Sequence, residues 1–269
     1  MMEPFQKLTE STLELKKWQQ MIPGLKAGFT TRNGGFSAPP FDTFNLGLHV
    51  PDLSADVISN RRKLADIVQM PLGSWVSGEQ THRTNIHTVA ECDKGKGSTA
   101  YDTSLRQIDG LLTSQTGLLC TAFFADCVPI FFLDPLTGYI GIAHAGWQGT
   151  VHHIAQKMVE RMQTAGADTA DICVAIGPSI SHDVYEVDER VINHIPQALF
   201  DKTVTVQGNN RFLLDLKQLN AEILLQQGVL RHNIDITNYC TFRDNQLFFS
   251  HRRDQGETGR MLGYIGYGK

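Results

Sequence analysis

The sequence predicts a mixed α/β fold in which layered β-sheets carry helices on their outer faces. Two observations support this prediction. Short apolar or β-branched runs, separated by turn residues such as Asp134-Pro135, fill the centre of the chain and are typical of strands. Four further segments place apolar residues at helical spacing. Hydrophobic residues make up 41% of the 269 residues, so a sizeable core can form. Because no linker or repeat interrupts the chain, we expect one domain over residues 1–269.

The expected strands are short, and several follow one another closely. The turn residues Pro135 to Gly138 separate two of them, which should therefore pair as an antiparallel hairpin. The expected strands are residues 84–89, 108–113, 117–124, 129–134, 139–144, 172–176, 236–242 and 246–250.

Helices are expected at residues 57–68, 151–162, 189–199 and 216–227. The first follows Ser54 as a capping residue, and the last begins after Asp215 and stops at Gly228. The segment 151–162 has the most regular apolar face. Pro196 interrupts the segment 189–199, because proline lacks the N–H that a helix interior needs.

Charge and hydropathy exclude several classes of partner. The formal net charge is −4 and the basic residues form no run, so we expect no nucleic-acid partner. The most apolar stretch, residues 118–133, contains Asp126 and is too short to span a bilayer. We therefore expect no membrane association and a cytoplasmic location. The five cysteines include no CxxC pair, which argues against a disulfide framework.

Asp126 stands out because it places a carboxylate inside an apolar run. A buried charge is costly unless it is paired or hydrogen-bonded. One interpretation is a turn in which Asp126 accepts hydrogen bonds from backbone N–H groups. The other is a catalytic role, as an acid or base beside Cys127. The sequence leaves both interpretations open.

Cys127 and His144 are separated by the expected hairpin, which should bring both side chains to one end of the sheet. His82 would have to arrive from elsewhere in the fold. A thiolate with two imidazoles suits zinc, and three protein ligands leave a position open, as in catalytic sites. Alternatives are a metal-free hydrolase with Cys127 as nucleophile and His144 as base, or a structural zinc site closed by a fourth ligand such as Cys240.

An anion site is also indicated. Gly149 precedes the expected helix from Val151, and the free N–H groups of a helix N-terminus attract anions. Arg32, Arg252 and Arg253 could add charge-assisted hydrogen bonds to phosphate. The alternative for each arginine is a solvated surface position.

These residues lie within motifs that resemble the YfiH/YlmD-like "laccase-domain" proteins, understood as multifunctional purine nucleoside phosphorylases. The resemblance covers nearly the whole chain. The matching segments are 31–37 (TRNGGFS), 45–47 (NLG), 60–61 (NR), 80–82 (QTH), 125–129 (ADCVP), 144–147 (HAGW), 176–178 (IGP), 185–187 (YEV), 240–241 (CT) and 248–254 (FFSHRRD). Two positions depart from the family pattern: Gln148 replaces an arginine, and His251 replaces a tyrosine.

The resemblance implies that His82, Cys127 and His144 bind a catalytic zinc ion, with copper as the alternative ion. It implies a layered α/β fold and phosphorolysis of adenosine, inosine and methylthioadenosine, together with deamination of adenosine. The substrates would thus be purine nucleosides and phosphate, and the motif positions of Arg32 and Asn45 suggest that both residues contact them. A four-copper phenol oxidase is disfavoured, because the ten histidines include no His-x-His pair.

Overall fold

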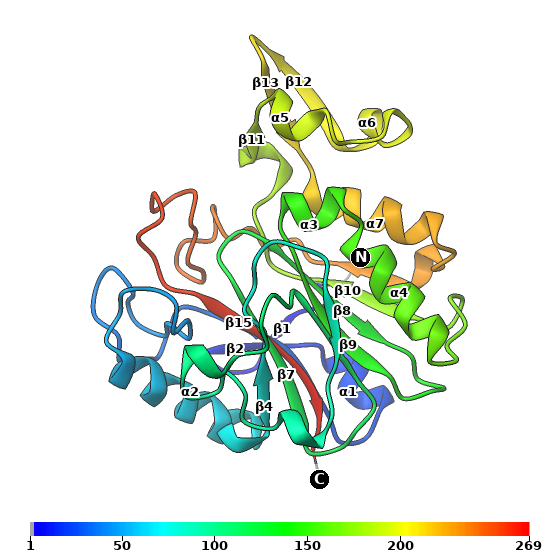
Figure 1. The fold of residues 1–269 in the computed structure, drawn as a ribbon. Coiled ribbons are helices and arrows are strands. Elements are labelled where there is room, and N and C mark those ends of the chain that lie inside the picture. Colours follow the sequence, from blue (N-terminus) through cyan, green and yellow to red (C-terminus); the bar gives the residue numbers. More distant parts are fainter. Residues whose placement is uncertain (1–2, 269) are drawn as a thin grey trace.

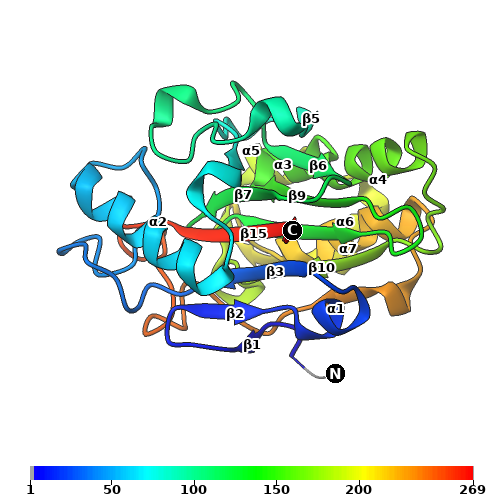
Figure 2. The same cartoon turned by 90° about the horizontal axis from the view of Figure 1, so that it is seen from below.

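Two six-stranded sheets pack face to face at the centre of the protein, and helices cover their outer faces (Figures 1 and 2). The computed structural model describes residues 3–268. In spatial order, the first sheet comprises β1 (Gln6–Lys7), β2 (Thr12–Glu14), β3 (Leu25–Thr30), β15 (Met261–Tyr267), β7 (Leu118–Phe124) and β4 (Trp75–Ser77). The second comprises β14 (Ile234–Ile236), β10 (Cys173–Ile176), β8 (Val128–Leu133), β9 (Ile140–Ala145), β6 (Gly110–Thr113) and β5 (Ile86–Thr88).

Three apolar clusters separate the layers. Between the sheets, Phe124 and Ile265 of the first sheet share one cluster with Phe131 and Ile142 of the second. Helix α2 (Ser54–Val68) packs its apolar residues on the outer face of the first sheet. Helices α4 (Ile154–Thr164) and α7 (Leu216–Gln226) do so on the second. Strands β7 and β8 are therefore covered on both faces, which explains why every residue in them is buried.

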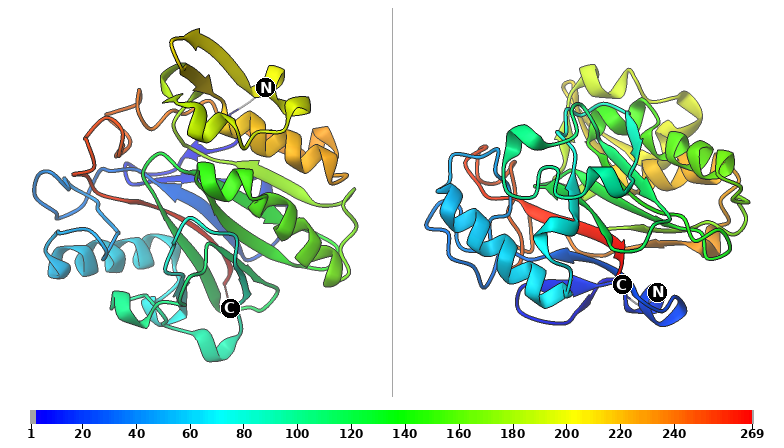
Figure 3. Two further views of the ribbon diagram at one scale, coloured as in Figure 1. Left: turned by 45° about the horizontal axis from the view of Figure 1, so that its top comes forward. Right: turned by 60° about the horizontal axis from the view of Figure 1, so that its bottom comes forward.

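The remaining elements are short. Helix α1 (Lys16–Met21) packs beside β3, and α3 (Trp147–Val151) directly precedes α4. A small lobe projects from the layers at the top of Figures 1 and 3, and it holds a three-stranded sheet. The lobe comprises β11 (Glu186–Val187), α5 (Glu189–Ile192), α6 (Gln197–Thr203), β12 (Val204–Gly208) and β13 (Arg211–Leu214). Single turns of 3-10 helix lie at Leu72–Ser74, Glu91–Asp93, Tyr101–Thr103, His182–Val184 and Arg231–Asn233.

The layered α/β fold is confirmed, and so is the central hairpin. Strands β8 and β9 pair antiparallel, with Val128 opposite Ala145 and Leu133 opposite Ile140. Cys127 directly precedes β8, and His144 lies near the end of β9. The hairpin therefore brings both residues to the same end of the sheet.

Several expected boundaries were wrong. The helix expected from Val151 begins at Trp147 and is broken at His153, whose φ of 64° is left-handed. The third expected helix, residues 189–199, is two short helices, because the chain is interrupted before Pro196. Helix α5 stops at Ile192, and α6 starts at Gln197. Leu53, and not Ser54, occupies the cap position of α2.

Two expected strands were also misplaced. Within the described residues, only Ile236 of the segment 236–242 belongs to a strand, and the segment 246–250 forms none. The chain here turns back repeatedly on itself. Its backbone is held by side chains, for example Asp244, whose carboxylate accepts the N–H of Cys240. Conversely, β3 and β15 were not expected, although they form the middle of the first sheet. None of the helices within residues 3–268 has the length and apolar character needed to cross a membrane.

Candidate metal centre

His82, Cys127 and His144 converge on one point at the end of the sheets. Their potential ligand atoms all lie within 4.8 Å of one another. The two imidazole rings meet edge to face, with 4.8 Å between their centroids. Each residue comes from a different place: His82 from the loop between β4 and β5, Cys127 from the turn before β8, and His144 from β9. His144 is buried, whereas His82 is exposed, so the group is accessible from one side.

Asp109 holds both histidines in place. Its Oδ1 lies 2.9 Å from Nδ1 of His144 and accepts the backbone N–H of His82 at 3.0 Å. Its Oδ2 accepts the backbone N–H groups of Thr81 and Arg83. With the proton of His144 on Nδ1, the lone pair of Nε2 is free for a ligand. The left-handed backbone of His82, with φ of 60°, is fixed by the same carboxylate.

The charges within the group favour a thiolate. Burial alone would raise the pKa of the Cys127 thiol, but the charge and hydrogen bond of His144, with a further hydrogen bond from His82, lower it. Burial alone would lower the pKa of His144, but Cys127 and Asp109 raise it. A thiolate with two imidazoles is the soft and borderline donor set that zinc binds well. The residues therefore fit a transition-metal ion with three protein ligands.

Gly146 leaves the space that the group needs. A Cβ atom at this position would lie 3.0 Å from Sγ of Cys127 and 3.0 Å from Cδ2 of His82. Any side chain there would push against two of the three candidate ligands. The glycine that precedes α3 is therefore required by close approach, since its own φ of −68° suits any residue.

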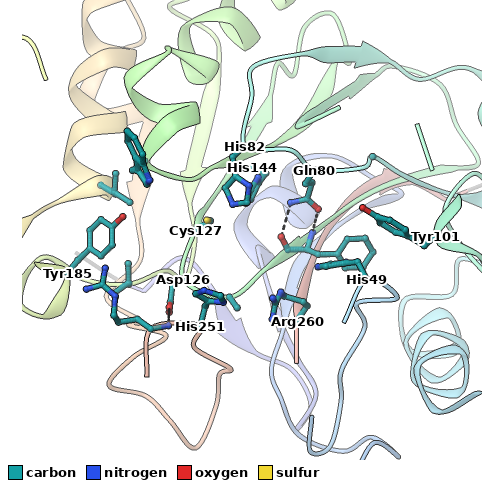
Figure 4. Close-up of a pocket in the computed structure, with 17 residues that line it drawn as sticks. His49, Gln80, His82, Tyr101, Asp126, Cys127, His144, Tyr185, His251 and Arg260 are labelled. Carbon is teal, nitrogen blue, oxygen red and sulfur yellow. Dashed lines mark hydrogen bonds between the residues drawn. The ribbon is translucent and has the colours of Figure 1, made fainter. Parts of the chain in front are cut away.

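A cavity of about 370 Å³ opens over the three residues. Figure 4 shows Tyr185 on one side of them and Tyr101 with His49 on the other. At the Tyr185 end, Trp147 and Leu216 belong to the same apolar cluster as Tyr185. At the opposite end, the His49 ring lies 5.8 Å from Tyr101 and 5.7 Å from Phe123, measured between centroids. The cavity thus has two aromatic ends with the candidate ligands between them.

Asp126 lines the cavity, but its carboxylate is engaged. Oδ1 accepts the hydroxyl of Thr241 at 2.6 Å, and Oδ2 accepts the hydroxyl of Ser250 at 3.0 Å and the N–H of Arg252 at 2.7 Å. Its φ is 86°, so the chain turns sharply at this residue. Of the two interpretations of Asp126, the geometry matches a turn residue that holds a loop.

The other expected anion ligands are dispersed. Arg252 lines the cavity, where its guanidinium lies 5.1 Å from the centroid of the Tyr185 ring. Arg32 and Arg253 line a separate surface hollow, paired with Asp42 and Asp254 respectively.

The last two expected residues do not line the cavity. Asn45 is fully buried and bonds to backbone groups and to Asp52. Gly149 lies buried inside α3 rather than before a helix, because the helix begins at Trp147, four residues earlier than expected.

Several cavity residues were not anticipated from the sequence. Beside the cavity, neither Asp109 nor Gly146 was expected to support the candidate ligands. Among the residues that line the cavity, His49, Tyr101 and Arg260 were not expected from the sequence. Of these residues, only Asp109 could have been found from the sequence. Like Asp126, it is a carboxylate that comes just before an apolar strand.

Known proteins match this chain over nearly its whole length. Residues 26–268 match the sequence profile of the family described as multi-copper polyphenol oxidoreductase laccase. The chain is 43% identical over 270 residues to "Purine nucleoside phosphorylase YlmD" of Bacillus subtilis, covering 98% of this chain and 97% of that protein. It is 44% identical over 249 residues to the protein of the same name from Geobacillus stearothermophilus, covering 90% of each.

Solved structures agree with the fold. The crystal structure of the Bacillus licheniformis hypothetical protein YfiH superposes with a TM-score of 0.94 at 42% identity, over 98% of this chain and 99% of that one. The structure of YlmD from Geobacillus stearothermophilus gives a TM-score of 0.95 at 40% identity over the full length of both chains.

Proposed function

We propose that the chain is a metal-dependent purine nucleoside phosphorylase. It belongs to the family described as multi-copper polyphenol oxidoreductase laccase. The relatives that carry this activity in their names are similar over nearly the full length of the chain. The observation that carries the proposal is the group His82, Cys127 and His144 at the centre of a cavity with aromatic ends. The volume of this cavity lies within the range of about 300–1,000 Å³ typical of small-molecule sites.

In phosphorolysis, an oxygen of phosphate forms a bond to C1′ of the ribose while the bond from C1′ to the purine nitrogen breaks. The bonding electrons leave with the base, which takes up a proton, and ribose 1-phosphate remains. The protein has to bind a flat base and an anion on opposite faces of the sugar. The aromatic residues at both ends of the cavity suit the base, and arginines at its wall suit the anion.

His82, Cys127 and His144 would hold a zinc ion, with copper as the alternative. When bound, such an ion supplies Lewis-acid polarisation of a substrate atom. Asp109 keeps the proton of His144 on Nδ1 and fixes the His82 backbone, so the His144 ring is oriented before any ion arrives. Phosphorolysis of methylthioadenosine and deamination of adenosine, in which water replaces the amine at C6, are part of the same proposal.

A metal-free Cys–His hydrolase is the second candidate. The lowered pKa of Cys127 and the neighbouring imidazoles would also suit a nucleophile and its base. The two remaining alternatives have less support. Among residues 3–268, His82, Cys127 and His144 form the one group of three or more suitable side chains. A structural zinc site lacks its fourth ligand there, and a four-copper oxidase lacks its further clusters.

The deciding experiment follows hypoxanthine release from inosine by chromatography, with phosphate varied from zero upward. We expect release to require phosphate and to stop after chelation of the metal. Cys127→Ser should lose both metal and activity, whereas Cys92→Ser, at an exposed cysteine, should retain both. Equal release without phosphate would make the protein a hydrolase. Full activity after complete metal removal would favour the metal-free Cys–His mechanism.

A further inference from the structure

Among residues 3–268, Arg260 in the cavity has no carboxylate partner, and two of its three guanidinium nitrogens make no hydrogen bond. We propose that Arg260, with His49 beside it, forms the subsite that binds inorganic phosphate, and that the Asn45–Gly47 turn sets its position. This proposal rests on the phosphorylase activity proposed above and assigns one end of the cavity to the anion.

The guanidinium of Arg260 is only half engaged. Its Nη1 donates to the carbonyl oxygens of Thr258 at 2.7 Å and Gly259 at 3.0 Å. Among residues 3–268, its Nε and Nη2 have no hydrogen-bond partner, and no carboxylate oxygen lies within 4.0 Å of its nitrogens. A partly buried charge with free donors is unfavourable unless it meets an anion. Arg260 therefore offers a forked pair of donors and an uncompensated positive charge to the cavity.

Other arginines of the protein show the contrast. Arg61 is buried, and its three guanidinium nitrogens donate to the carbonyl oxygens of Leu46, Gly97 and Ser98. Arg253 uses its three nitrogens on Asp254 and on backbone carbonyl oxygens. Both are committed to holding loops together. Arg260 is anchored through Nη1 alone, which fixes the side chain while leaving its other nitrogens available.

The anchoring of Arg260 comes from a distant part of the sequence. Oδ1 of Asn45 accepts the backbone N–H of Arg260 at 2.9 Å and that of Gly47 at 3.0 Å. A Cβ atom at Gly47 would lie 2.8 Å from Cγ of Arg260 and 3.2 Å from Cε1 of His49. The turn therefore needs glycine in order to let both side chains lie against it. Asn45 acts here as a positioning residue, which accounts for its burial away from the cavity.

The position of Arg260 suits an in-line reaction. Figure 4 shows Arg260 and His49 on the opposite side of the candidate ligands from Tyr185. Since phosphate and base occupy opposite faces of C1′, an anion at Arg260 places the purine at the end lined by Trp147, Tyr185 and Leu216. Arg252 at that end is the competing candidate. Its Nη1 donates to the carbonyl oxygen of Glu186, and its guanidinium stacks on Tyr185, so it is better placed to border the base.

The test compares Arg260→Gln, Arg260→Lys and Gly47→Ala with Arg62→Gln, a control on the exposed face of α2. Binding of inorganic phosphate to the metal-loaded protein is measured by calorimetry, and the KM values for phosphate and inosine are measured by turnover. Arg260→Gln should weaken phosphate binding and raise the phosphate KM at least about tenfold, because charge-assisted hydrogen bonds are lost. The inosine KM should change less than about twofold, since the base lies at the other end.

Two further results would support the subsite. Arg260→Lys should recover part of the affinity, because it restores the charge without the fork. Gly47→Ala should shift the phosphate KM in the same direction as Arg260→Gln. Thermal unfolding of each variant checks that the effect is not a loss of fold. Arg62→Gln should match the wild type in every measurement.

The proposal would be overturned if Arg260→Gln bound phosphate as tightly as the wild type. It would equally fail if Arg252→Gln, and not Arg260→Gln, raised the phosphate KM, which would place the anion at the Tyr185 end. Failure of the proposed function gives a different result. In that case the wild type would bind phosphate through Arg260 but release no base from inosine. A wild type that binds no phosphate would refute the subsite directly.

Discussion

Asp109 and Asp126 are two buried carboxylates near the candidate metal ligands, and they contact different regions. Asp109 contacts the ligands themselves, through the ring of His144 and the backbone of His82. Asp126 is next to Cys127 in the sequence, yet its carboxylate points to the loop of Thr241, Ser250 and Arg252. Asp126, although it is next to the candidate ligand Cys127 in the sequence, is therefore not the carboxylate that contacts the candidate ligands.

The difference follows from backbone direction. At Asp126 the chain turns through a left-handed conformation, and the side chain is hydrogen-bonded to Thr241, Ser250 and Arg252. Asp109 immediately precedes β6, which pairs with β9, and its backbone carbonyl accepts the N–H of His144 at 2.8 Å. Strand pairing thus places Asp109 beside His144 although 35 residues separate them. We infer that Asp109 supports metal binding, whereas Asp126 holds the loop that contains Ser250 and Arg252 in place.

The largest effect should come from Cys127, the candidate ligand that follows Asp126 in the chain. Cys127→Ala removes a thiolate and disturbs neither carboxylate, so zinc affinity should fall by at least about 100-fold, more than for loss of an outer-shell contact. Base release from inosine should fall with it. Zinc content is measured by atomic spectroscopy after purification, and activity by chromatography. If the variant still held one zinc ion per chain, Cys127 would not be a ligand, and the contrast between the Asp109 and Asp126 regions would lose its basis.

Asp109→Asn should have the next largest effect. The amide can no longer accept from both His144 and the backbone N–H groups, so the ring of His144 loses its fixed orientation. Loss of such an outer-shell partner typically lowers metal affinity by about 10–100-fold. Competition with a chromogenic chelator measures this affinity. If zinc affinity were unchanged, Asp109 would be only a structural residue like Asp126.

Asp126→Asn should act mainly on stability. One carboxylate oxygen now accepts two hydrogen bonds, from Ser250 and Arg252, and an amide group there would leave donors unpaired. We expect a loss of about 1–3 kcal/mol in the free energy of unfolding and a change in zinc affinity below about twofold, because its carboxylate contacts none of the three ligands.

Urea unfolding and the same chelator competition test this expectation for Asp126. Thr241→Val, which removes one of the hydroxyl donors, serves as the matched control and should also lower stability without metal loss. The opposite result, normal stability with lost activity, would restore the acid–base role of Asp126.

The smallest effect concerns pH. Burial would raise the pKa of Asp109, but the hydrogen bond and charge of His144, with the N–H groups of Arg83 and Thr81, lower it below its ordinary value of 3.8. The unfolded chain therefore binds the proton more readily. The stabilisation by Asp109 is complete above the ordinary pKa and is lost as the pH falls from about 5 towards the folded-state value.

The metal-free wild type and Asp109→Asn are the pair to compare for this effect. Their difference in unfolding free energy should shrink as the pH is lowered through this range. A difference that stays constant with pH would mean that the charge of Asp109 contributes nothing to stability.

Much of the fold could be predicted from the sequence because its signals are local. The apolar runs of β7, β8 and β9 and the N-cap of α7 at Asp215 lie within a few residues of their expected places. The strands that were missed, β3 and β15, interrupt their apolar residues with glycines such as Gly28 and Gly263, which weakens the strand pattern. Gly28 is needed because the side chain of Tyr264 occupies the space of its Cβ.

The sequence by itself determined the layered α/β class and, through its motifs, the three residues that converge as candidate ligands. These depend on residue type and short spacing, which a single chain displays directly. Only the tertiary structure decided which carboxylate supports the candidate ligands and which nitrogens of Arg260 make no hydrogen bond within residues 3–268. Asp109 reaches His144 through strand pairing, and Arg260 is set by a turn 215 residues away. Such contacts depend on how distant segments pack and on which donors the packing leaves unpaired, and neither is written in local sequence.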